Sequence, residues 1–582
     1  MARFQIKKNP KAYDVCIVGS GAGGGMAAYI LSRAGMKVAL LEAGPMYDPA
    51  KNVTQLKWPW ESPRRGASTN ERSFGDFDAA YGGWNLDGEP FNLKNGTKFS
   101  WFRARMLGGR TNHWGRISLR FGPKDFKHKS IDGLGEDWPI GYDDVAPFYD
   151  RVDKLIGLFG SVENIPNEPD GIYLPPPKPR LHELFLKDAV TSMGMPVIPG
   201  RLSILTKPLP DNNERKPCFY CAQCNRGCTV YGDFSSSSVL INPALKTGNI
   251  DVIVNAMARE VITNNEGLAT GISYVDKSDM QEYQVSAKVV VLAASACESA
   301  RLMLNSKSAA HPNGLSNSSN VVGKYLHDST GSAIGGVIPK LFGRKRYNED
   351  GTGGAHIYTP WWLDNKKLDF PRGYHIEYGG GQGMPGYGFG FGIQGLNGKF
   401  PGSNGVKKDA GGYGASLKAD YRHFQFGAGF SLEGRGEAIA REDNYCEIDP
   451  TTVDKFGIPV LRFNYNWSDF EIKQAKHMQE TFQEIAHNLG GEITWGLSGK
   501  ENNYGLTAPG QIIHEVGTVR MGNDPKKSAL NKHNQAHDCK NLFVVDGGAF
   551  VSQADKNPTW TILALSMRAS EFIIDELKKQ NL

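Results

Sequence analysis

Cysteine is concentrated at one place in this sequence. Of its eight cysteines, four fall in a single short segment, as Cys218, Cys221, Cys224 and Cys228. The spacing Cys-x2-Cys-x2-Cys-x3-Cys is that by which one loop supplies thiolates to an iron–sulfur cluster. Zinc also accepts four thiolates, but usually from two separated Cys-x-x-Cys pairs that hold it from both sides. The segment therefore predicts an iron–sulfur cluster, with zinc, disulfides or free thiols as the alternatives.

A second group of residues suited to chemistry lies near the N-terminus, in the run Gly19-Ser20-Gly21-Ala22-Gly23-Gly24. Glycine permits a tight turn here and lets backbone N–H groups approach a pyrophosphate at the positive end of the next helix. Glu42 follows at about the 20-residue spacing at which a carboxylate accepts hydrogen bonds from an adenosine ribose. A plain glycine turn and an ordinary strand-end carboxylate are the alternatives. We predict a dinucleotide site with contacts at Gly19, Gly21, Gly24 and Glu42.

The elements around the glycines fit this site. Residues 13–18 and 37–42 are short apolar runs, and residues 27–34 between them have helical composition. Together they predict a strand, a turn, a helix and a second strand. Similar apolar runs, with the near-continuous apolar character of buried parallel strands, occur at residues 251–254, 289–293 and 542–545. The nucleotide-binding sheet is therefore expected to be assembled from distant segments.

Residues 330–465 are richer in glycine and aromatic residues, for example at 378–381 and 387–392. This composition predicts an antiparallel sheet with loops over a pocket. Residues 468–489 then carry apolar side chains at helical spacing, with Ser468 as the expected cap and Gly490 after the end. We expect that apolar stripe to face the core.

Size and charge restrict the class of protein. A chain of 582 residues with 40% hydrophobic composition can bury a large core and is expected to form two intertwined domains. Lys and Arg total 66 against 61 acidic residues, without basic runs, so no nucleic-acid partner is expected. No run is long enough to span a bilayer, and the first eight residues lack the apolar core of a signal peptide. The chain by itself is expected to be cytoplasmic.

The two ends of the chain carry a specific resemblance. The glycine turn and the C-terminal run Val545-Asp546-Gly547-Gly548 resemble the glucose-methanol-choline (GMC) oxidoreductases, which combine both ends into one FAD domain. The resemblance covers most of the chain and extends to residues 105–109, 514–518 and 557–561. It implies FAD rather than NAD, because the glycine turn begins almost at the N-terminus and the C-terminal run supplies a second cofactor contact.

The family implies an α/β fold in which a Rossmann-like FAD-binding domain is interleaved with a substrate domain built on an antiparallel sheet. Residues 10–330 would form the first part of the FAD-binding domain, including an iron–sulfur loop at 215–230. Residues 331–505 would form the substrate-binding domain, and residues 506–582 the remainder of the FAD-binding domain with the catalytic pair. Beyond the four residues of the dinucleotide site, the cofactor contacts implied by the resemblance are Arg105, Gly108, Gly109, Asn112, His113, Asp546 and Gly547.

Residues 108–114, Gly-Gly-Arg-Thr-Asn-His-Trp, are similar to the family branch that contains pyranose oxidase and bacterial sugar dehydrogenases. His113 matches the histidine that pyranose oxidase bonds covalently to its flavin. The related dehydrogenases share the His-Trp pair and generally hold FAD without that bond. Non-covalent packing of His113 beside the isoalloxazine is therefore favoured over a covalent link.

Oxidation of an alcohol needs a base within hydrogen-bond reach of the hydroxyl while hydride passes to the flavin. His514, in the family's His-x-x-Gly-Thr run, is predicted to be that base, and an imidazole suits one-proton transfer near neutrality. Asn557 matches the second member of the family's pair, and its amide would orient the substrate or stabilise a developing alkoxide. Asn557 also precedes Pro558 and an apolar helical stretch, as a helix cap would.

The resemblance also bears on the cysteines. Bacterial FAD-dependent glucose and fructose dehydrogenases carry a [3Fe-4S] cluster in the corresponding region, with spacing like that of Cys218, Cys224 and Cys228. The additional Cys221 leaves a [4Fe-4S] cluster open. A cluster passes electrons singly to another protein, which favours a dehydrogenase with a cytochrome c-type acceptor. In the similar enzymes a small subunit bearing the export signal accompanies the catalytic chain, which implies a periplasmic or membrane-associated location.

The function implied is a sugar dehydrogenase that oxidises a pyranose hydroxyl, with C3 of a glucoside favoured over C1. A C1 glucose dehydrogenase and an oxygen-using pyranose oxidase are the alternatives. A non-enzymatic electron-transfer subunit is disfavoured, because the sequence contexts of His514 and Asn557 are intact.

Overall fold

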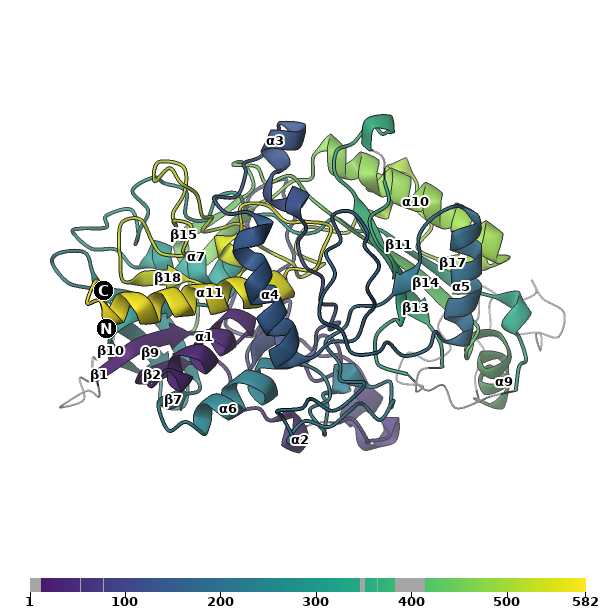
Figure 1. Cartoon of the computed structure of the whole chain (residues 1–582), viewed down its shortest axis with the longest axis horizontal. Helices are drawn as coiled ribbons and strands as arrows, with labels where there is room; N and C mark the ends of the chain where they lie inside the picture. Colours follow the sequence, from purple (N-terminus) through teal and green to yellow (C-terminus); the bar gives the residue numbers. More distant parts are fainter. Residues whose placement is uncertain (1–11, 53, 77, 346–350, 364, 383–413) are drawn as a thin grey trace.

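The computed structural model describes residues 12–52, 54–76, 78–345, 351–363, 365–382 and 414–582. Figure 1 shows two lobes side by side, each built around a sheet. The first strand and the last helix lie in the same lobe, so chain segments from opposite ends share one core. The glycine- and aromatic-rich residues 387–392 lie outside the described part of the chain.

The first lobe contains a parallel sheet in the order β7-β2-β1-β10, with β18 paired to β10. Its strands carry long apolar runs because both faces of the sheet are covered. The bounds are β1 (Ala12–Val18), β2 (Val38–Leu41), β7 (Ile250–Ile253), β10 (Gln281–Leu292) and β18 (Leu542–Val544). The apolar runs predicted as strands are confirmed, including their assembly from distant segments.

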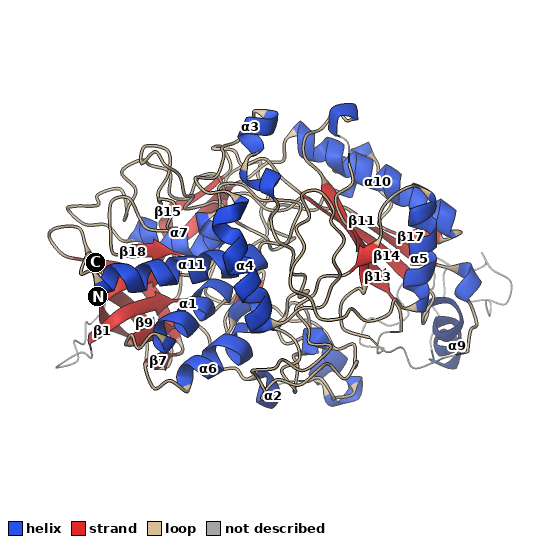
Figure 2. Ribbon diagram, viewed as in Figure 1, coloured by secondary structure: helices blue, strands red, loops and turns tan. Residues whose placement is uncertain are grey.

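Two more strands, β8 (Ala256–Thr263) and β9 (Ala269–Asp276), extend this sheet as an antiparallel meander beyond β10. Helices α1 and α11 pack against each other beside α4 along the first lobe (Figure 2). Their bounds are α1 (Ala22–Arg33), α4 (Tyr142–Ile156) and α11 (Thr559–Lys578), and α7 (Ala296–Asn305) follows β10 directly.

The second lobe contains an antiparallel sheet in the order β17-β11-β14-β13-β12-β6. Helices α5 (Leu181–Ser192) and α10 (Asp469–Leu489) bury their apolar side chains against it. Ser468 caps α10 by accepting a hydrogen bond from the Phe470 N–H, and Gly490 ends it at φ 63°. The strand bounds are β6 (Ile198–Pro199), β11 (Ala333–Val337), β12 (Ile357–Thr359), β13 (Tyr374–Gly380), β14 (Gly429–Gly436) and β17 (Glu492–Trp495).

The predicted fold class, a Rossmann-like domain with a second domain on an antiparallel sheet, is confirmed. A smaller sheet joins β15 (Tyr445–Val453), β16 (Pro459–Asn464) and β4 (Asn92–Leu93). The shorter elements are α2 (Pro49–Asn52), α3 (His128–Asp132), α6 (Asn242–Leu245), α9 (Gly414–Asp420), β3 (Gly82–Gly83) and β5 (Arg103–Ala104). In the described ranges, no helix combines the length and apolar character needed to cross a bilayer.

Candidate active site

A cavity of about 460 Å³ is lined by residues from both lobes. The first lobe contributes the glycine turn after β1 and the loop after β5, and the second contributes side chains of β13 and β14. The segments around His514 and Asn557 complete the wall. Predicted cofactor and catalytic residues that are far apart in the sequence are therefore brought to one cavity.

The glycine turn has the geometry that a dinucleotide site needs. Gly19 has φ 93°, and a Cβ on Gly24 would lie 1.8 Å from the Gly19 carbonyl oxygen, so both positions require glycine. Gly21 precedes the first residue of α1 and has no chain atom within 4 Å of where its Cβ would be. The N-terminus of α1 carries no side-chain cap, and its N–H groups are available to an anion in the cavity.

Glu42 lies at the end of β2 and lines the same cavity. Its carboxylate accepts hydrogen bonds from the Ser20 hydroxyl and from the Gly44 N–H, the latter at 2.8 Å. Burial raises its pKa, although these hydrogen bonds favour the charged form. The carboxylate is thereby fixed beside the glycine turn, where a ribose of a bound dinucleotide would be recognised.

The loop after β5 turns at two glycines with positive φ, Gly108 at 88° and Gly109 at 53°. Asn112 supports this turn, since its side-chain amide donates to the Leu107 carbonyl at 2.8 Å and its Oδ1 accepts from Ser237. Gly109 lines the cavity, whereas Gly108 and Asn112 shape the loop from behind. Gly108 and Asn112 therefore stabilise the conformation of the loop but do not line the cavity.

Arg105 lines the cavity, but its guanidinium is engaged by two carboxylates. It pairs with Glu89 at 2.7 Å and with Glu298 of α7 at 2.5 Å. The charge at this predicted cofactor contact is thus already balanced within the protein. Arg105 holds the loop after β5 against α7.

His113 faces the cavity and packs against Phe74 and Phe102, with ring centroids 5.9 and 5.3 Å away. Its Nε2 is buried and has no hydrogen-bond partner among the described residues. Burial, together with the charges of Arg116 and Arg110, lowers the pKa of His113 to about 3. His113 thus presents a neutral ring with one unpaired nitrogen in the wall of the cavity, where a bound group would be its partner.

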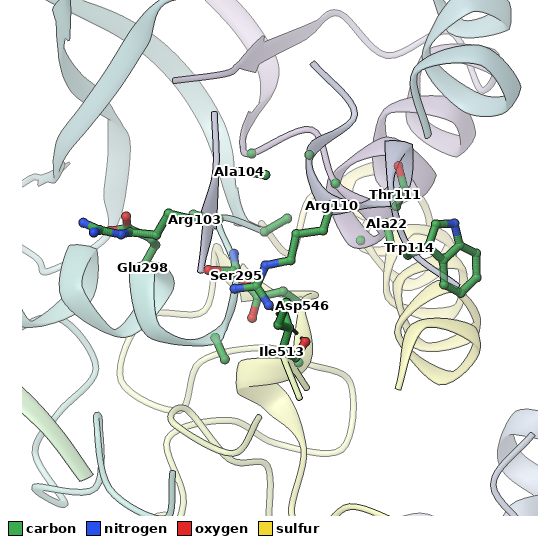
Figure 3. Close-up of a pocket in the computed structure, with 18 of the residues that line it drawn as sticks. Ala22, Arg103, Ala104, Arg110, Thr111, Trp114, Ser295, Glu298, Ile513 and Asp546 are labelled. Carbon is green, nitrogen blue, oxygen red and sulfur yellow. Dashed lines mark hydrogen bonds between the residues drawn. The ribbon is translucent and has the colours of Figure 1, made fainter. Parts of the chain in front are cut away.

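The C-terminal run contributes Asp546 and Gly547 to the wall. Asp546 accepts hydrogen bonds from Ser299 Oγ at 2.5 Å and from the Gly548 N–H at 2.8 Å, and burial raises its pKa to about 6. In Figure 3 the side chain of Arg110 points toward Asp546 and Ile513. Arg110 donates to the Ile513 carbonyl at 3.2 Å, which ties the loop after β5 to the segment that carries His514.

His514 is partly buried in the wall and held at three atoms. Its backbone N–H donates to Asp328 Oδ1 at 2.9 Å, and its Nδ1 lies 3.0 Å from Ser329 Oγ. Its Nε2 lies 3.5 Å from Asn557 Nδ2. Burial and the charge of Arg435 lower the pKa of His514 to about 3, against the opposing effect of Glu377. The ring is therefore neutral and can accept a proton.

Asn557 does not cap the helix that follows it. Pro558 is the N-cap position of α11 and makes no side-chain cap hydrogen bond. The Asn557 amide instead donates to Glu377 Oε1 at 3.4 Å and faces His514 Nε2. Its Oδ1 is buried without a hydrogen-bond partner in the described structure. The predicted pair therefore lies together at the cavity, and the cap interpretation is wrong.

Two of the charged wall residues that were not predicted, Glu377 and Arg435, come from the second lobe. Glu377 of β13 lies 3.5 Å from Arg435 of β14 and 3.2 Å from His375 Nε2. Burial alone would raise the pKa of Glu377, but the charge of Arg435 and the hydrogen bond with His375 lower it to about 2. No sequence spacing links these strands to the His514 segment, so no local signal was available. An ionised carboxylate and a guanidinium thus face the predicted catalytic pair.

The four cysteines of the predicted cluster lie on one loop and are free thiols. Each sulfur has an N–H donor: Tyr220 N to Cys218 at 3.3 Å, Gln55 Nε2 to Cys221 at 3.1 Å, Gly353 N to Cys224 at 3.3 Å and Gly232 N to Cys228 at 3.2 Å. Such donors suit thiolate ligands. In the described part of the chain, however, no three Cys, His, Asp or Glu side chains are placed to hold one metal ion.

Comparison with known proteins places the chain in a family. Models of the family described as GMC oxidoreductase match residues 22–330 with their N-terminal part and residues 440–566 with their C-terminal part. The 2-methyl-1,2-propanediol dehydrogenase of Mycolicibacterium austroafricanum is 30% identical, over 96% of this chain and 95% of that protein. The fructose dehydrogenase large subunit of Gluconobacter japonicus is 26% identical, over 97% and 98%.

The solved structures agree with this fold. Formate oxidase of Aspergillus oryzae superposes with a TM-score of 0.64 at 13% identity, covering 98% of this chain and all of that one. At this identity the likeness concerns the fold alone. The chain belongs to the GMC oxidoreductase family, as its glycine turn and C-terminal run predict, and is an oxidoreductase acting on CH–OH groups.

Proposed function

We propose that this enzyme is an FAD-dependent dehydrogenase that oxidises a hydroxyl of a sugar or related polyol. The observation that carries the proposal is the placement of His514 and Asn557 in the wall of the cavity that also contains the glycine turn. The residues fit FAD: the turn offers N–H groups to a pyrophosphate, Glu42 offers acceptors to a ribose, and His113 presents an unpaired ring nitrogen. When bound, FAD would supply the hydride acceptor.

The chain's own residues would handle the proton. His514 Nε2 takes the hydroxyl proton while the carbon loses hydride and the C–O bond becomes a carbonyl. The Asn557 amide donates a hydrogen bond to the oxygen on which negative charge develops. Glu377, held ionised, stabilises the imidazolium that His514 becomes. Two electrons leave the substrate with the hydride and one proton remains on His514.

The polarity of the cavity wall supports a polyhydroxylated substrate. The wall near the catalytic pair presents the Glu377 carboxylate and the Arg435 guanidinium, which suit a molecule with several hydroxyls. The names of the relatives, a diol dehydrogenase and a fructose dehydrogenase, support a polyol. We take C3 of a glucoside as the first position to test, with C1 of glucose as the alternative. We propose that His113 packs beside the flavin without a covalent bond.

We further propose that Cys218, Cys221, Cys224 and Cys228, in the loop at 215–230, would hold an iron–sulfur cluster, which would supply one-electron transfer toward a cytochrome c-type protein. The supporting observations are the cysteine spacing and the N–H donors that reach all four sulfurs. A small subunit carrying an export signal would accompany the chain, and the complex would act in the periplasm or at the membrane. The similar fructose dehydrogenase of Gluconobacter japonicus is named as a large subunit, which is consistent with such a partner.

The experiment is anaerobic reduction of the purified holoenzyme by a panel of sugars and small diols. We expect bleaching of the oxidised flavin spectrum by polyols, and the oxidised carbon identified by NMR of the product. His514→Ala should slow flavin reduction by roughly a hundredfold or more, the usual size of a general-base contribution. Flavin released intact by acid precipitation would exclude the covalent bond to His113.

Three outcomes would contradict the proposal. Equal flavin reduction in His514→Ala would remove this residue as the base. Failure of every sugar and diol to reduce the flavin would remove the substrate class. Peroxide formation at the rate of turnover, in protein that contains no iron after anaerobic purification, would assign an oxidase instead.

A further inference from the structure

The side of His514 that faces away from the cavity is held by a pair of buried polar residues. Ser329 Oγ lies 3.0 Å from His514 Nδ1, and the Gln553 side-chain amide lies 2.6 Å from the same oxygen. Ser329 and Gln553 are 2% and 0% exposed. A buried hydroxyl with two neighbours of this kind is fixed in orientation, because solvent cannot compete for it.

The contacts of the other ring nitrogen, His514 Nε2, show which tautomer of the ring is present. Glu377 is ionised, so its carboxylate can only accept hydrogen bonds, and the Asn557 atom 3.4 Å from it must be the amide nitrogen. The same amide nitrogen faces His514 Nε2 at 3.5 Å. A donor facing Nε2 requires a lone pair there. In the neutral ring the proton must then be on Nδ1.

We propose that Ser329, held by Gln553, is a positioning residue that accepts the Nδ1 proton of His514 and so keeps the Nε2 lone pair facing the cavity. The serine oxygen has two acceptor sites, one for the His514 N–H and one for the Gln553 amide. The inference rests on the proposed role of His514 as the base. It extends that role by naming the residues that hold His514 in the tautomer able to accept a proton. Ser329 is 185 positions away from His514 in the sequence.

The consequence of losing this contact is specific. An imidazole with its proton on Nε2 would donate to the substrate hydroxyl instead of accepting its proton, although ring position and charge would be unchanged. Loss of the correct tautomer lowers the rate of the proton-transfer step without removing any group that touches the substrate. Flavin reduction should therefore slow while substrate affinity changes little.

The test is Ser329→Ala, with His514 observed directly. In holoenzyme labelled with 15N in its histidine rings, His514 is assigned by its absence in His514→Gln. We expect wild-type His514 to show a protonated Nδ1 and an unprotonated Nε2, and Ser329→Ala to gain the Nε2-protonated form. Flavin reduction should slow by roughly tenfold to a hundredfold, with KM within about twofold. Ser329→Thr, which keeps the hydroxyl, should restore both the tautomer and most of the rate.

Ser332→Ala is the matched control. Ser332 is also a buried serine that accepts a glutamine amide, from Gln479 at 2.8 Å, but its hydroxyl donates to the Tyr504 carbonyl and not to His514. It should leave the tautomer and the rate as in wild type. Gln553→Leu tests the same contact if Ser329→Ala does not fold.

The proposal is overturned if Ser329→Ala or Gln553→Leu keeps the wild-type tautomer, or if Ser332→Ala slows flavin reduction equally. The ring spectrum does not depend on turnover, so it tests Ser329 even if no polyol reduces the flavin. Failure of the proposed function and failure of this inference are thereby distinguished.

Discussion

The charges around His514, the proposed base, help to set the pKa of its ring. Burial and the positive charge of Arg435 on β14 lower its pKa, as do His375 on β13 and Arg110 in the loop after β5. Glu377 on β13 opposes them, and the resulting pKa is about 3. A ring that loses its proton at so low a pH is neutral throughout the physiological range. His514 therefore needs no pH change to become active.

The pH dependence of flavin reduction follows. Because the base form is present above its pKa, the rate should be nearly constant from about pH 5 to 8 and fall only as the pH approaches about 3. An unperturbed histidine would instead lose activity below about pH 6.5. Anaerobic stopped-flow measurement of flavin reduction by a saturating polyol, at a series of pH values, gives this pH dependence. A midpoint near 6.5 for His514 would show that burial of the ring does not govern its titration.

Glu377 is expected to contribute to the rate through its charge. In Glu377→Gln the imidazolium formed at His514 loses its nearby carboxylate, while the shape of the side chain is kept. At an effective dielectric constant of about 20, close charges interact by a few kcal/mol. We therefore expect flavin reduction to slow by about tenfold or more, measured under anaerobic single-turnover conditions.

Glu433→Gln is the control for that change. Glu433 lies on the neighbouring strand β14 and also pairs with Arg435, at 2.6 Å, but it is more exposed and does not line the cavity. Its loss should change the rate less than twofold. Equal effects of both substitutions would show that the pairing of Arg435 matters, and not a carboxylate beside His514.

At the scale of elements, the turn between β1 and α1 has glycines for two different reasons, one concerning folding and the other concerning the ligand. Gly24 is needed for folding, because a Cβ there would lie 1.8 Å from the Gly19 carbonyl oxygen. Gly21 is expected to serve the ligand, because its Cβ would meet no chain atom within 4 Å and it lines the cavity. One turn is therefore expected to serve both the packing of α1 on the sheet and the binding of the cofactor.

Two alanine substitutions test this separation. Gly24→Ala should lower the free energy of unfolding of the apoprotein by roughly 1–3 kcal/mol or more, as overpacking does. Gly21→Ala should leave that free energy within about 0.5 kcal/mol while reducing the FAD content of the purified protein. Urea unfolding and the flavin-to-protein absorbance ratio measure the two quantities. Normal FAD content in Gly21→Ala would place the pyrophosphate elsewhere.

The helices α10 and α11 show where the local sequence did and did not predict the structure. Residues 468–489 were predicted as a helix with Ser468 as its cap, and α10 has these features because capping and apolar periodicity are properties of one segment. Asn557 before Pro558 carries an equally plausible local signal for a cap, yet its amide turns to Glu377 and His514. A contact with another lobe outweighed the local preference there.

On the scale of the whole molecule, the cysteine loop and the cavity are expected to work in sequence. Cys224→Ser should abolish bound iron and electron delivery to a one-electron protein acceptor, while polyols still reduce the flavin anaerobically, because His514 and the glycine turn are untouched. Iron analysis, electron paramagnetic resonance and cytochrome c reduction measure these properties. Cys221→Ser distinguishes the cluster types, since a three-ligand cluster would keep its iron.

Wild-type protein without iron after anaerobic purification would contradict this electron path. Loss of flavin reduction in Cys224→Ser would contradict it in another way, because the loop would then be required for the fold of the cavity. In that case the N–H donors at the sulfurs, such as that of Gly353 to Cys224, would be interpreted as packing of a structural loop.

The sequence by itself determined the features that depend on neighbouring residues: the glycine turn, the apolar strands, the helix at 468–489 and the family. It also predicted His514 and Asn557 as the catalytic pair, because their sequence runs resemble those of the family. Only the tertiary structure decided what surrounds them. Glu377, Arg435, Ser329 and Gln553 reach the catalytic pair through strand pairing and the meeting of the two lobes. Contacts between segments so far apart leave no spacing in the chain, so they can be seen only once it is folded.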